Sequence, residues 1–171
     1  MKINNLCDVS KIKLLVLDVD GTLTDGKLYI GNNGEMFKVF DIKDGGGIYD
    51  ILPEIGIEPV IITARKSEIV NHRCNDLNIK YVFQGIRNKA EQLKEFCASL
   101  GYTLNEAGVY EEVAYVGDDL IDIPIMNLAY LKCCPKNAVK KVLEVVDWVS
   151  DYDGGNGAVR EIIEYIYENK I

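Results

Sequence analysis

The chain has 171 residues, a length that fits one ordinary domain. Hydrophobic residues make up 48% of it and charged residues 27%, which is a globular composition. The formal net charge of −8 argues against a nucleic-acid partner, because phosphate backbones are bound mainly by clustered Lys and Arg. An anionic small substrate stays possible if a metal ion reverses the local field.

The sequence also bears on location. The first ten residues lack the charged-then-apolar pattern of a signal peptide. No apolar run approaches the roughly 20 residues that a membrane-spanning helix needs, so we expect no membrane partner. The cysteines form no CxxC pair and no disulfide framework, and we interpret them as buried thiols in a reducing cytoplasm: Cys7, Cys74, Cys97, Cys133 and Cys134.

The first predicted element is an apolar strand over residues 13–18, which ends in Asp18 and is followed by Asp20. Residues 27–40 then predict two strands joined by Gly-Asn-Asn-Gly, because Asn and Gly tolerate the positive φ of tight hairpins. Both faces of this hairpin carry apolar side chains, so a monomer would expose a large apolar patch. We expect another surface to cover it. The alternative is that the hairpin packs onto its own core.

Beyond the hairpin, apolar runs alternate with amphipathic segments. The predicted strands span 58–63, 81–83, 113–118, 128–133 and 147–149, and the predicted helices 45–54, 66–77, 88–100, 119–127, 136–145 and 157–169. Continuous Val, Ile and Leu runs are typical of parallel strands covered on both faces. The alternation predicts one α/β domain over residues 1–171, a doubly wound (Rossmann-like) parallel sheet with a projecting β-hairpin flap.

Three predicted strands end in polar groups suited to phosphoryl transfer. The first strand ends in Asp18, with Asp20 two residues on, the second ends in Thr63, and the run at 113–118 ends in Asp118, with Asp119 next. Ligands in open α/β sheets bind at the carboxyl ends of the strands, so neighbouring strands would bring four carboxylates together. A hard divalent cation relieves their repulsion, and Mg²⁺ commonly uses one or two carboxylates with water and phosphate. The acids therefore predict a metal site.

Each motif also has an ordinary structural explanation. An Asp-Gly pair is common in turns that close a strand. The run Gly117-Asp-Asp fits a loop followed by a helix N-cap. An isolated Lys89 at the start of a helix would usually be a solvated residue of the first turn. A turn does not explain a second acid cluster on another strand end, so the combination favours a functional site.

In this combination the sequence resembles the haloacid dehalogenase superfamily of phosphatases, whose four motifs match Asp18-Val-Asp-Gly-Thr-Leu-Thr, Thr63, Lys89 and Gly117-Asp-Asp. From about residue 12 to 165 it is similar to the family of 3-deoxy-D-manno-octulosonate 8-phosphate (KDO 8-phosphate) phosphatases. The further matching segments are Gly31-Asn-Asn-Gly-Glu, Asp44-Gly-Gly-Gly-Ile, Ile61-Ile-Thr-Ala-Arg-Lys, Gln84-Gly, Ala114-Tyr-Val-Gly-Asp-Asp-Leu-Ile-Asp and Gly154-Gly-Asn-Gly-Ala-Val-Arg-Glu. The resemblance implies Mg²⁺-dependent hydrolysis of KDO 8-phosphate to KDO and phosphate, in lipopolysaccharide precursor synthesis.

The resemblance also implies residue roles. Asp18 would attack phosphorus, hold the phosphoryl group as a mixed anhydride and bind Mg²⁺ through its other oxygen. Asp20 would protonate the departing sugar oxygen and then activate water, while its backbone carbonyl would be a metal ligand. Asp118 would complete the metal ligands. Thr63 and Lys89 would bind the phosphoryl oxygens in the ground and transition states.

Other positions carry weaker expectations. Asp119 and Asp122 would support the metal as outer or alternate ligands. Arg65 would pair with the carboxylate of the sugar acid, with a surface salt bridge as the alternative. Gly45 and Gly46 would let the backbone approach the substrate, unless they only start a helix.

The intervals between the motifs leave no room for the cap domain that many relatives carry, so the site would lie open to water. The resembled family is a tetramer in which hairpins from adjacent chains help to enclose the site. We therefore expect a homotetramer with the hairpin at the interface. The alternatives are the same chemistry on a nine-carbon keto-sugar-acid phosphate or another small phosphate ester and, more remotely, a non-catalytic phosphosugar-binding oligomer.

Overall fold

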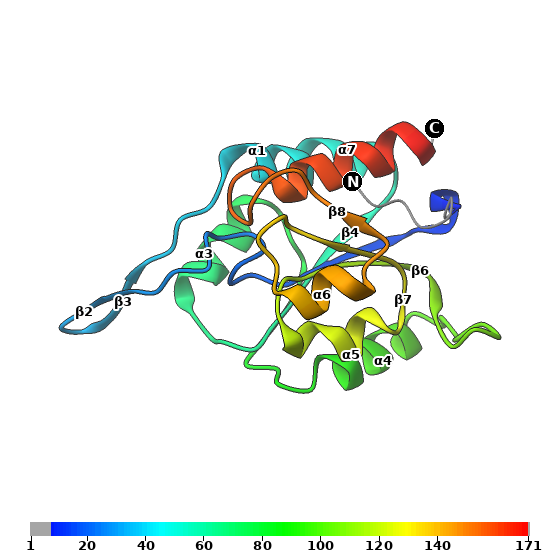
Figure 1. The fold of residues 1–171 in the computed structure, drawn as a ribbon, viewed down its shortest axis with the longest axis horizontal. Coiled ribbons are helices and arrows are strands. Elements are labelled where there is room, and N and C mark those ends of the chain that lie inside the picture. The colour runs from blue at the N-terminus through cyan, green and yellow to red at the C-terminus, as the bar shows by residue number, and fades with distance from the viewer. Residues whose placement is uncertain (1–7, 171) are drawn as a thin grey trace.

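The structure, a computed structural model, describes residues 8–170. Its six parallel strands form one sheet in the order β5-β4-β1-β6-β7-β8 (Figure 1). The strands are β1 (Leu14–Leu17), β4 (Glu58–Thr63), β5 (Tyr81–Gln84), β6 (Tyr110–Val116), β7 (Ala129–Cys134) and β8 (Trp148–Val149). Strands β4 and β5 extend the sheet on one side of β1, and strands β6, β7 and β8 extend it on the other side. The predicted doubly wound sheet is confirmed, and its switch point lies between β1 and β6.

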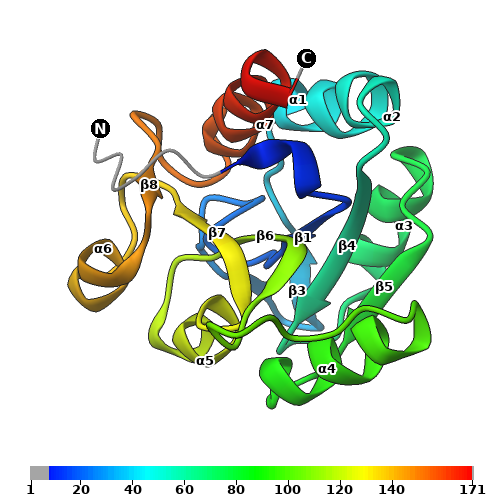
Figure 2. The ribbon, with the colours of Figure 1, turned by 90° about the vertical axis from the view of Figure 1, so that its right-hand side faces the viewer.

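Helices cover both faces of this sheet (Figure 2). One face carries α3 (Glu68–Asp76), α7 (Ala158–Lys170) and a helical segment made of α1 (Ile42–Gly46), the π-helical turn η2 (Gly47–Ile51) and α2 (Leu52–Glu54). The other face carries α4 (Lys89–Ser99), α5 (Ile123–Met126) and α6 (Lys140–Val145). Short 3₁₀ turns are η1 (Val9–Lys11) and η3 (Leu120–Asp122).

The apolar run of β1 explains why the sheet is covered on both sides. All four of its residues are buried. Leu15 and Leu17 belong to the core cluster with α3 and α7, whereas Leu14 and Val16 belong to the cluster with α4 and α5. Alternate side chains of a strand point to opposite faces, so an uninterrupted apolar run requires two cores.

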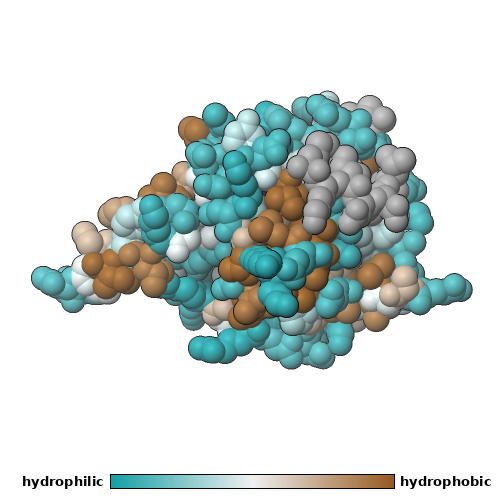
Figure 3. Space-filling view, viewed as in Figure 1, coloured by the Kyte–Doolittle hydropathy of each residue, from teal (hydrophilic) through white to brown (hydrophobic). Residues whose placement is uncertain are grey.

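The hairpin consists of β2 (Tyr29–Gly31) and β3 (Gly34–Phe37) and projects from the end of the sheet where the strands finish (Figure 1). An isolated antiparallel bridge between Thr24 and Phe40 closes its base. Five apolar side chains along it are between 40% and 64% exposed, and they give the arm a hydrophobic surface (Figure 3): Leu28, Ile30, Met36, Phe37 and Val39. The predicted flap is confirmed, and between β4 and α4 only α3 and β5 intervene, so no cap domain is present there.

The structure bears on the expectations about membrane-spanning helices and about cysteines. Within residues 8–170, no helix is both long and apolar enough to span a bilayer. Cys74, Cys97, Cys133 and Cys134 are buried, as predicted, and none of them forms a disulfide within the described residues. Cys7 lies outside the described residues, as do most of the first ten residues, on which the expectation of no signal peptide rests.

Candidate active site

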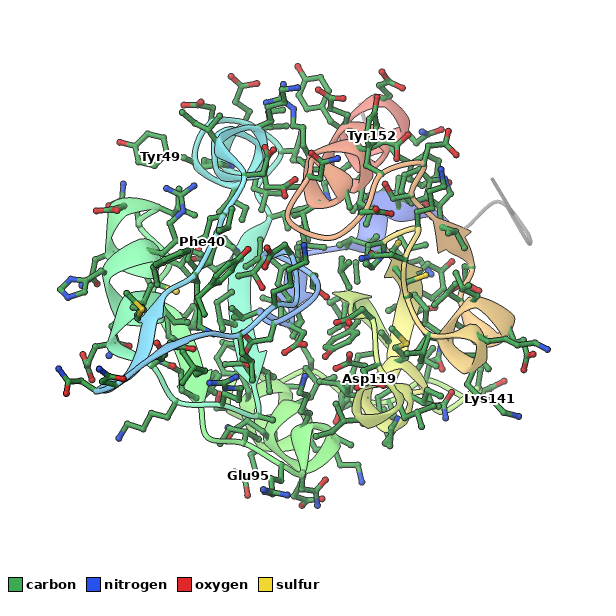
Figure 4. The ribbon with its side chains drawn as sticks, turned by 60° about the vertical axis from the view of Figure 1, so that its left-hand side comes forward. Phe40, Tyr49, Glu95, Asp119, Lys141 and Tyr152 are labelled. Atoms are coloured by element: carbon green, nitrogen blue, oxygen red, sulfur yellow. The ribbon has the colours of Figure 1, made fainter. Side chains whose placement is uncertain are left out.

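The acidic motifs meet at the switch point of the sheet. Asp18 follows β1 and Asp118 follows β6, and these strands are paired with Leu17 opposite Val116. Gly21 makes the approach possible, because a Cβ on it would lie 2.2 Å from a carboxylate oxygen of Asp118. Gly21 thus lets the loop after β1 lie against the Asp118 carboxylate. An Asp-Gly turn that only closed a strand would not need this close approach. Figure 4 looks onto this end of the molecule and shows the neighbouring Asp119 on the loop after β6.

Lys89 is the cation of this cluster. It is the first residue of α4, and its side chain is almost fully buried. Its Nζ lies 2.8 Å from Oδ1 of Asp18 and 2.6 Å from Oδ1 of Asp122. A buried ammonium is tolerated only when it is paired, so the solvated first-turn lysine of the alternative explanation is wrong for Lys89.

The Asp122 carboxylate holds the other residues of the cluster in place through hydrogen bonds. Its Oδ1 also accepts a hydrogen bond from the hydroxyl of Tyr115 (2.6 Å), and its Oδ2 accepts from the backbone N–H groups of Asp118 (2.9 Å) and Asp119 (3.1 Å). Gly117 permits this, because a Cβ there would lie 2.5 Å from the Asp122 carboxyl carbon. Both oxygens of Asp122 are occupied, so it holds the loop and Lys89 in place and is poorly suited to bind a metal directly.

The electrostatics of the cluster call for a further cation. Burial raises the pKa of Asp18 to about 6, although the Lys89 ammonium opposes the shift. Burial and then the negative charges of Asp18 and Asp122 raise the pKa of Asp118 to about 7. Burial lowers the pKa of Lys89, but its two carboxylate partners outweigh burial and the net pKa is raised. One ammonium therefore does not compensate three neighbouring carboxylates.

The donor set fits a hard divalent ion. One carboxylate oxygen from each of Asp18, Asp118 and Asp122 lies within 4.8 Å of the others. Since Asp122 is already engaged, Asp18 and Asp118 are the protein carboxylates best placed as ligands. Two carboxylates with water and substrate phosphate completing the shell are typical of Mg²⁺, so the predicted metal site fits.

A second charged network lies beside the cluster, at the root of the hairpin. The ammonium of Lys38 contacts the carboxylate of Asp20 and lies 3.0 Å from Oε1 of Glu35. The same Glu35 oxygen lies 3.1 Å from the guanidinium of Arg65, and its other oxygen accepts a 2.6 Å hydrogen bond from the Ser67 hydroxyl. Burial alone would raise the pKa of Glu35, but hydrogen bonds from Ser67 and Lys38 and the nearby cations hold it below its usual value.

Known proteins resemble this chain in sequence and in fold. No family model matches the chain. The 3-deoxy-D-manno-octulosonate 8-phosphate phosphatase KdsC of Escherichia coli is 41% identical over 161 residues, which cover 94% of this chain and 82% of that protein. The chain belongs to the KDO 8-phosphate phosphatase family. Members of this family are phosphoric monoester hydrolases, and the predicted resemblance is confirmed.

Solved structures agree with this family assignment. The KDO 8-phosphate phosphatase of Moraxella catarrhalis, solved with a magnesium ion, a phosphate ion and KDO, superimposes with a TM-score of 0.87 at 34% identity, covering 95% of this chain and 90% of that one. A subfamily III A hydrolase of the haloacid dehalogenase superfamily from Legionella pneumophila gives 0.87 at 37% identity, covering 95% and 86%.

Other family positions fall around the same edge of the sheet. Thr63 is the buried last residue of β4, next to β1. Its backbone carbonyl accepts from the N–H of Ile86 (3.0 Å), and the carbonyl of Arg65 accepts from the N–H of Gly85 (3.1 Å). These bonds tie the loop after β4 to the loop after β5, which fixes Thr63 and Arg65 at the rim of the family site.

Gly45 and Gly46 have a packing explanation in this family member. Both lie inside α1. A Cβ on Gly45 would lie 2.2 Å from the guanidinium of Arg73 on α3, and one on Gly46 would face Arg160 on α7. Gly45 thus lets α1 lie close to α3, whereas a Cβ on Gly46 would make only ordinary contact with Arg160, and the predicted role of both glycines in substrate binding stays a prediction.

Three side chains that contact residues of this site could not be assigned to it from the sequence pattern: Tyr115, Glu35 and Lys38. Tyr115 was counted only as part of an apolar strand, although its hydroxyl reaches Asp122. Glu35 ends a segment that resembles the family and Lys38 follows three residues later, but the apolar pattern of the hairpin indicates no partner for either. The available signal was that two opposite charges three residues apart interrupt an otherwise apolar strand, which is unusual unless the charges have partners.

Proposed function

We propose that the chain is a Mg²⁺-dependent phosphomonoesterase that hydrolyses KDO 8-phosphate to KDO and phosphate in lipopolysaccharide precursor synthesis. The observation that carries the proposal is the buried Asp18 carboxylate, held by Lys89 and adjacent to Asp118, at the switch point of a sheet shared with KDO 8-phosphate phosphatases. This arrangement combines a nucleophile, a buried cation and two metal-ligating acids at one edge.

Asp18 acts as the nucleophile. One of its carboxylate oxygens attacks phosphorus while the bond from phosphorus to the sugar oxygen breaks, which leaves an aspartyl phosphate. Its Oδ1 is held by Lys89 at 2.8 Å, so the side chain is fixed before the substrate arrives. A fixed nucleophile lowers the entropic cost of reaching the attacking geometry.

Asp20 moves the protons of both steps. It gives a proton to the departing sugar oxygen and then takes one from the water that attacks the phosphorus of the aspartyl phosphate. Phosphate leaves, and Asp18 returns to a carboxylate. Thr63 and Lys89 bind the phosphoryl oxygens, where charge is concentrated in the transition state.

Asp18 and Asp118 hold the magnesium ion, together with the backbone carbonyl of Asp20. When bound, the ion neutralises the charge of the acids and of the phosphoryl group. Asp122 supports the site by fixing the Asp118 loop and Lys89 through its four contacts. The arrangement follows the general pattern in which outer residues orient metal ligands.

Arg65 selects the substrate by pairing with the carboxylate of the sugar acid. Its side chain lies at the rim and is 40% exposed, with Glu35 as its partner in the substrate-free chain. A planar guanidinium suits bidentate pairing with a carboxylate. An exposed cation on the loop after β4, the strand next to β1, supports an anionic substrate.

The experiment is phosphate release from KDO 8-phosphate with and without Mg²⁺, for the unmodified chain and for Asp18→Asn. The unmodified chain should be active only with the metal, and Asp18→Asn should lose at least about a thousandfold in kcat because the aspartyl phosphate cannot form. Asp76→Asn, which changes an exposed acid on α3, is the matched control and should keep its activity. Full activity of Asp18→Asn would end the nucleophile assignment, and a clear preference for a nine-carbon keto-sugar-acid phosphate would end the substrate assignment.

The proposal extends to assembly and location. We propose a homotetramer in which the exposed apolar arm of one chain lies against its neighbours, since an open arm of this kind is costly in water. We also propose a cytoplasmic location, because the described cysteines are reduced and buried. Cell fractionation should find the protein with cytosolic markers.

A further inference from the structure

Lys38 differs from the hairpin that carries it. Only 2% of its side chain is exposed, although it directly follows β3 and its apolar neighbours Phe37 and Val39 are largely exposed. Lysine is almost never buried to this extent unless its charge is paired. The chain therefore directs one hairpin side chain inward, toward the catalytic edge of the sheet, while the apolar ones face out.

The ammonium of Lys38 forms an ion pair with the carboxylate of Asp20. Among residues 8–170, Lys38 is the one side chain that contacts the Asp20 carboxylate at ion-pair or hydrogen-bond distance, and it does so through Oδ1. The other oxygen, Oδ2, is left without a protein partner in that range. A carboxylate held by one oxygen and open at the other is suited to exchange a proton with a ligand in a defined direction.

Lys38 is itself fixed from the far side. Its Nζ lies 3.0 Å from Glu35, whose two oxygens are also held by the guanidinium of Arg65 and the hydroxyl of Ser67. The backbone N–H of Ser67 in turn donates to Gln84 at the end of β5 (2.8 Å). The ammonium is thus braced between the hairpin and the loop after β4, and it is not free to swing away from Asp20.

We infer that Lys38 is a positioning residue for the reaction: it orients the Asp20 carboxylate so that Oδ2 faces the leaving-group oxygen. The inference rests on the proposed function, because it assigns the partner of the residue that moves the proton. It gives the hairpin a role inside its own chain, in addition to any surface that it offers to another copy.

A purely structural role for Lys38 makes a different prediction. If the ion pair only anchors the hairpin, removing it should weaken catalysis on every phosphate ester by a similar factor. If it positions Asp20, the loss should depend on how much the leaving group needs a proton. The sugar alkoxide needs one, whereas p-nitrophenolate departs with little help.

The test compares kcat/KM for KDO 8-phosphate and for p-nitrophenyl phosphate, since kcat/KM reports the steps up to departure of the leaving group. Lys38→Met should lower the value for the sugar ester by about a hundredfold, the low end of the range for proton transfer by a positioned group. It should lower the value for the aryl ester much less. Lys38→Arg should recover part of the loss, and Lys27→Met, which changes an exposed hairpin lysine, should alter neither value.

A double-mutant comparison separates positioning from direct substrate contact. In an Asp20→Asn background, Lys38→Met should cause no further loss, because the group on which it acts is already gone. A further loss there, or an equal loss on both esters in the single variant, would overturn the inference. If Lys38→Met does not fold, as judged by its thermal transition, Lys38→Gln takes its place.

Failure of the proposed function looks different. If the unmodified chain does not hydrolyse KDO 8-phosphate, the comparison is made with whichever alkyl phosphate it does hydrolyse against p-nitrophenyl phosphate. Selective loss on the alkyl ester would still support the role of Lys38. If Lys38→Met kept the same ratio of kcat/KM for the two esters as the unmodified chain, the role of Lys38 would be contradicted.

Discussion

At the scale of single residues, the site holds an electrostatic imbalance that is intrinsic to its architecture. Asp18 and Asp122 pair with Lys89 and Asp118 lies beside them, and burial with repulsion from neighbouring carboxylates raises the pKa of Asp18 to about 6 and that of Asp118 to about 7. The native chain without metal therefore binds protons more tightly than the unfolded chain between about pH 4 and pH 7. Its stability falls as the pH rises through that window.

Magnesium should reverse this pH dependence. Metal and protons compete for the same carboxylates, so the ion binds better once Asp18 and Asp118 are ionised. We expect saturating Mg²⁺ to raise the midpoint of thermal unfolding much more at pH 8 than at pH 5.5, measured by differential scanning calorimetry. Asp118→Asn should remove most of the difference. An equal increase at both pH values would contradict a site built from these acids.

Arg65 should act on substrate choice. Arg65→Ala removes the guanidinium that we expect to bind the sugar-acid carboxylate, so KM for KDO 8-phosphate should rise by about tenfold or more, in keeping with loss of a charge-assisted hydrogen bond worth about 1.5–3 kcal/mol. The KM for a neutral sugar phosphate should change little. Lys66→Ala, at the adjacent exposed position, is the matched control. Equal effects on both substrates would make Arg65 structural.

The sequence predicts where the acids at the strand ends and Lys89 lie, but it does not predict which side chains hold them in place. Asp18, Asp118 and Lys89 could be predicted to converge because each follows a strand or begins a helix at one edge of the sheet. The partners Lys38 and Glu35 could not, because their pairing depends on how far the hairpin bends back toward the body. That bend follows from tertiary contacts that no local pattern specifies.

At the scale of elements, the root of the hairpin packs on the body of the domain, whereas its arm exposes apolar side chains to solvent. Phe40 packs onto the core at the root, with the guanidinium of Arg73 5.7 Å from its ring centre, and points into the body in Figure 4. Farther out, Tyr29 and Phe37 stack on each other at 4.4 Å, which stiffens the arm. A stiff apolar arm keeps its shape for a partner and loses little entropy on docking.

Polar substitution on the arm should disrupt assembly. Replacing Ile30 and Met36 by Ser removes two of the most exposed apolar side chains of the arm. We expect the mass measured by light scattering to fall from that of a tetramer toward that of a monomer. Leu104→Ser, at an exposed site in the loop before β6, should leave the mass unchanged. A monomeric unmodified chain would contradict the assembly proposal.

Most elements were predictable because the continuous apolar runs of the strands differ clearly from the helical spacing of apolar residues in the helices. Some element boundaries were not predictable. The first helix was expected to begin at residue 45, whereas it begins at Ile42, because the Asp41 carboxylate caps it through the N–H groups of Lys43 and Asp44. Its middle turn is π-helical, which a 3.6-residue pattern does not reveal. The helix expected over residues 136–145 begins only at Lys140.

At the scale of the whole molecule, contacts between distant segments support what we propose is a single domain over residues 1–171. The N-terminus of α7 is capped by the Asp44 carboxylate, which accepts from the N–H of Arg160 at 2.7 Å. On the same helix, Tyr165 stacks on Trp148 of β8 at 5.5 Å. Contacts between segments far apart in sequence therefore tie α7 to α1 and to the edge strand β8.

A single domain should unfold in one step. Trp148 is the only tryptophan and is buried at the edge strand, so its fluorescence reports on the periphery, whereas far-ultraviolet circular dichroism reports on all helices. We expect the two signals to give coincident urea transitions at constant protein and Mg²⁺ concentration. Separate midpoints would show that the β7–β8 edge unfolds independently.

The loop before α7 has a consequence for synthesis. A Cβ on Gly154 would lie 1.8 Å from the carbonyl oxygen of Gly21, and the N–H of Gly155 donates to the carbonyl of Thr22 at 3.1 Å. The turn that carries the nucleophile is thus completed by backbone made more than 130 residues later. A nascent chain still emerging from the ribosome cannot close that turn, so the enzyme should acquire activity only after this late segment leaves the exit tunnel.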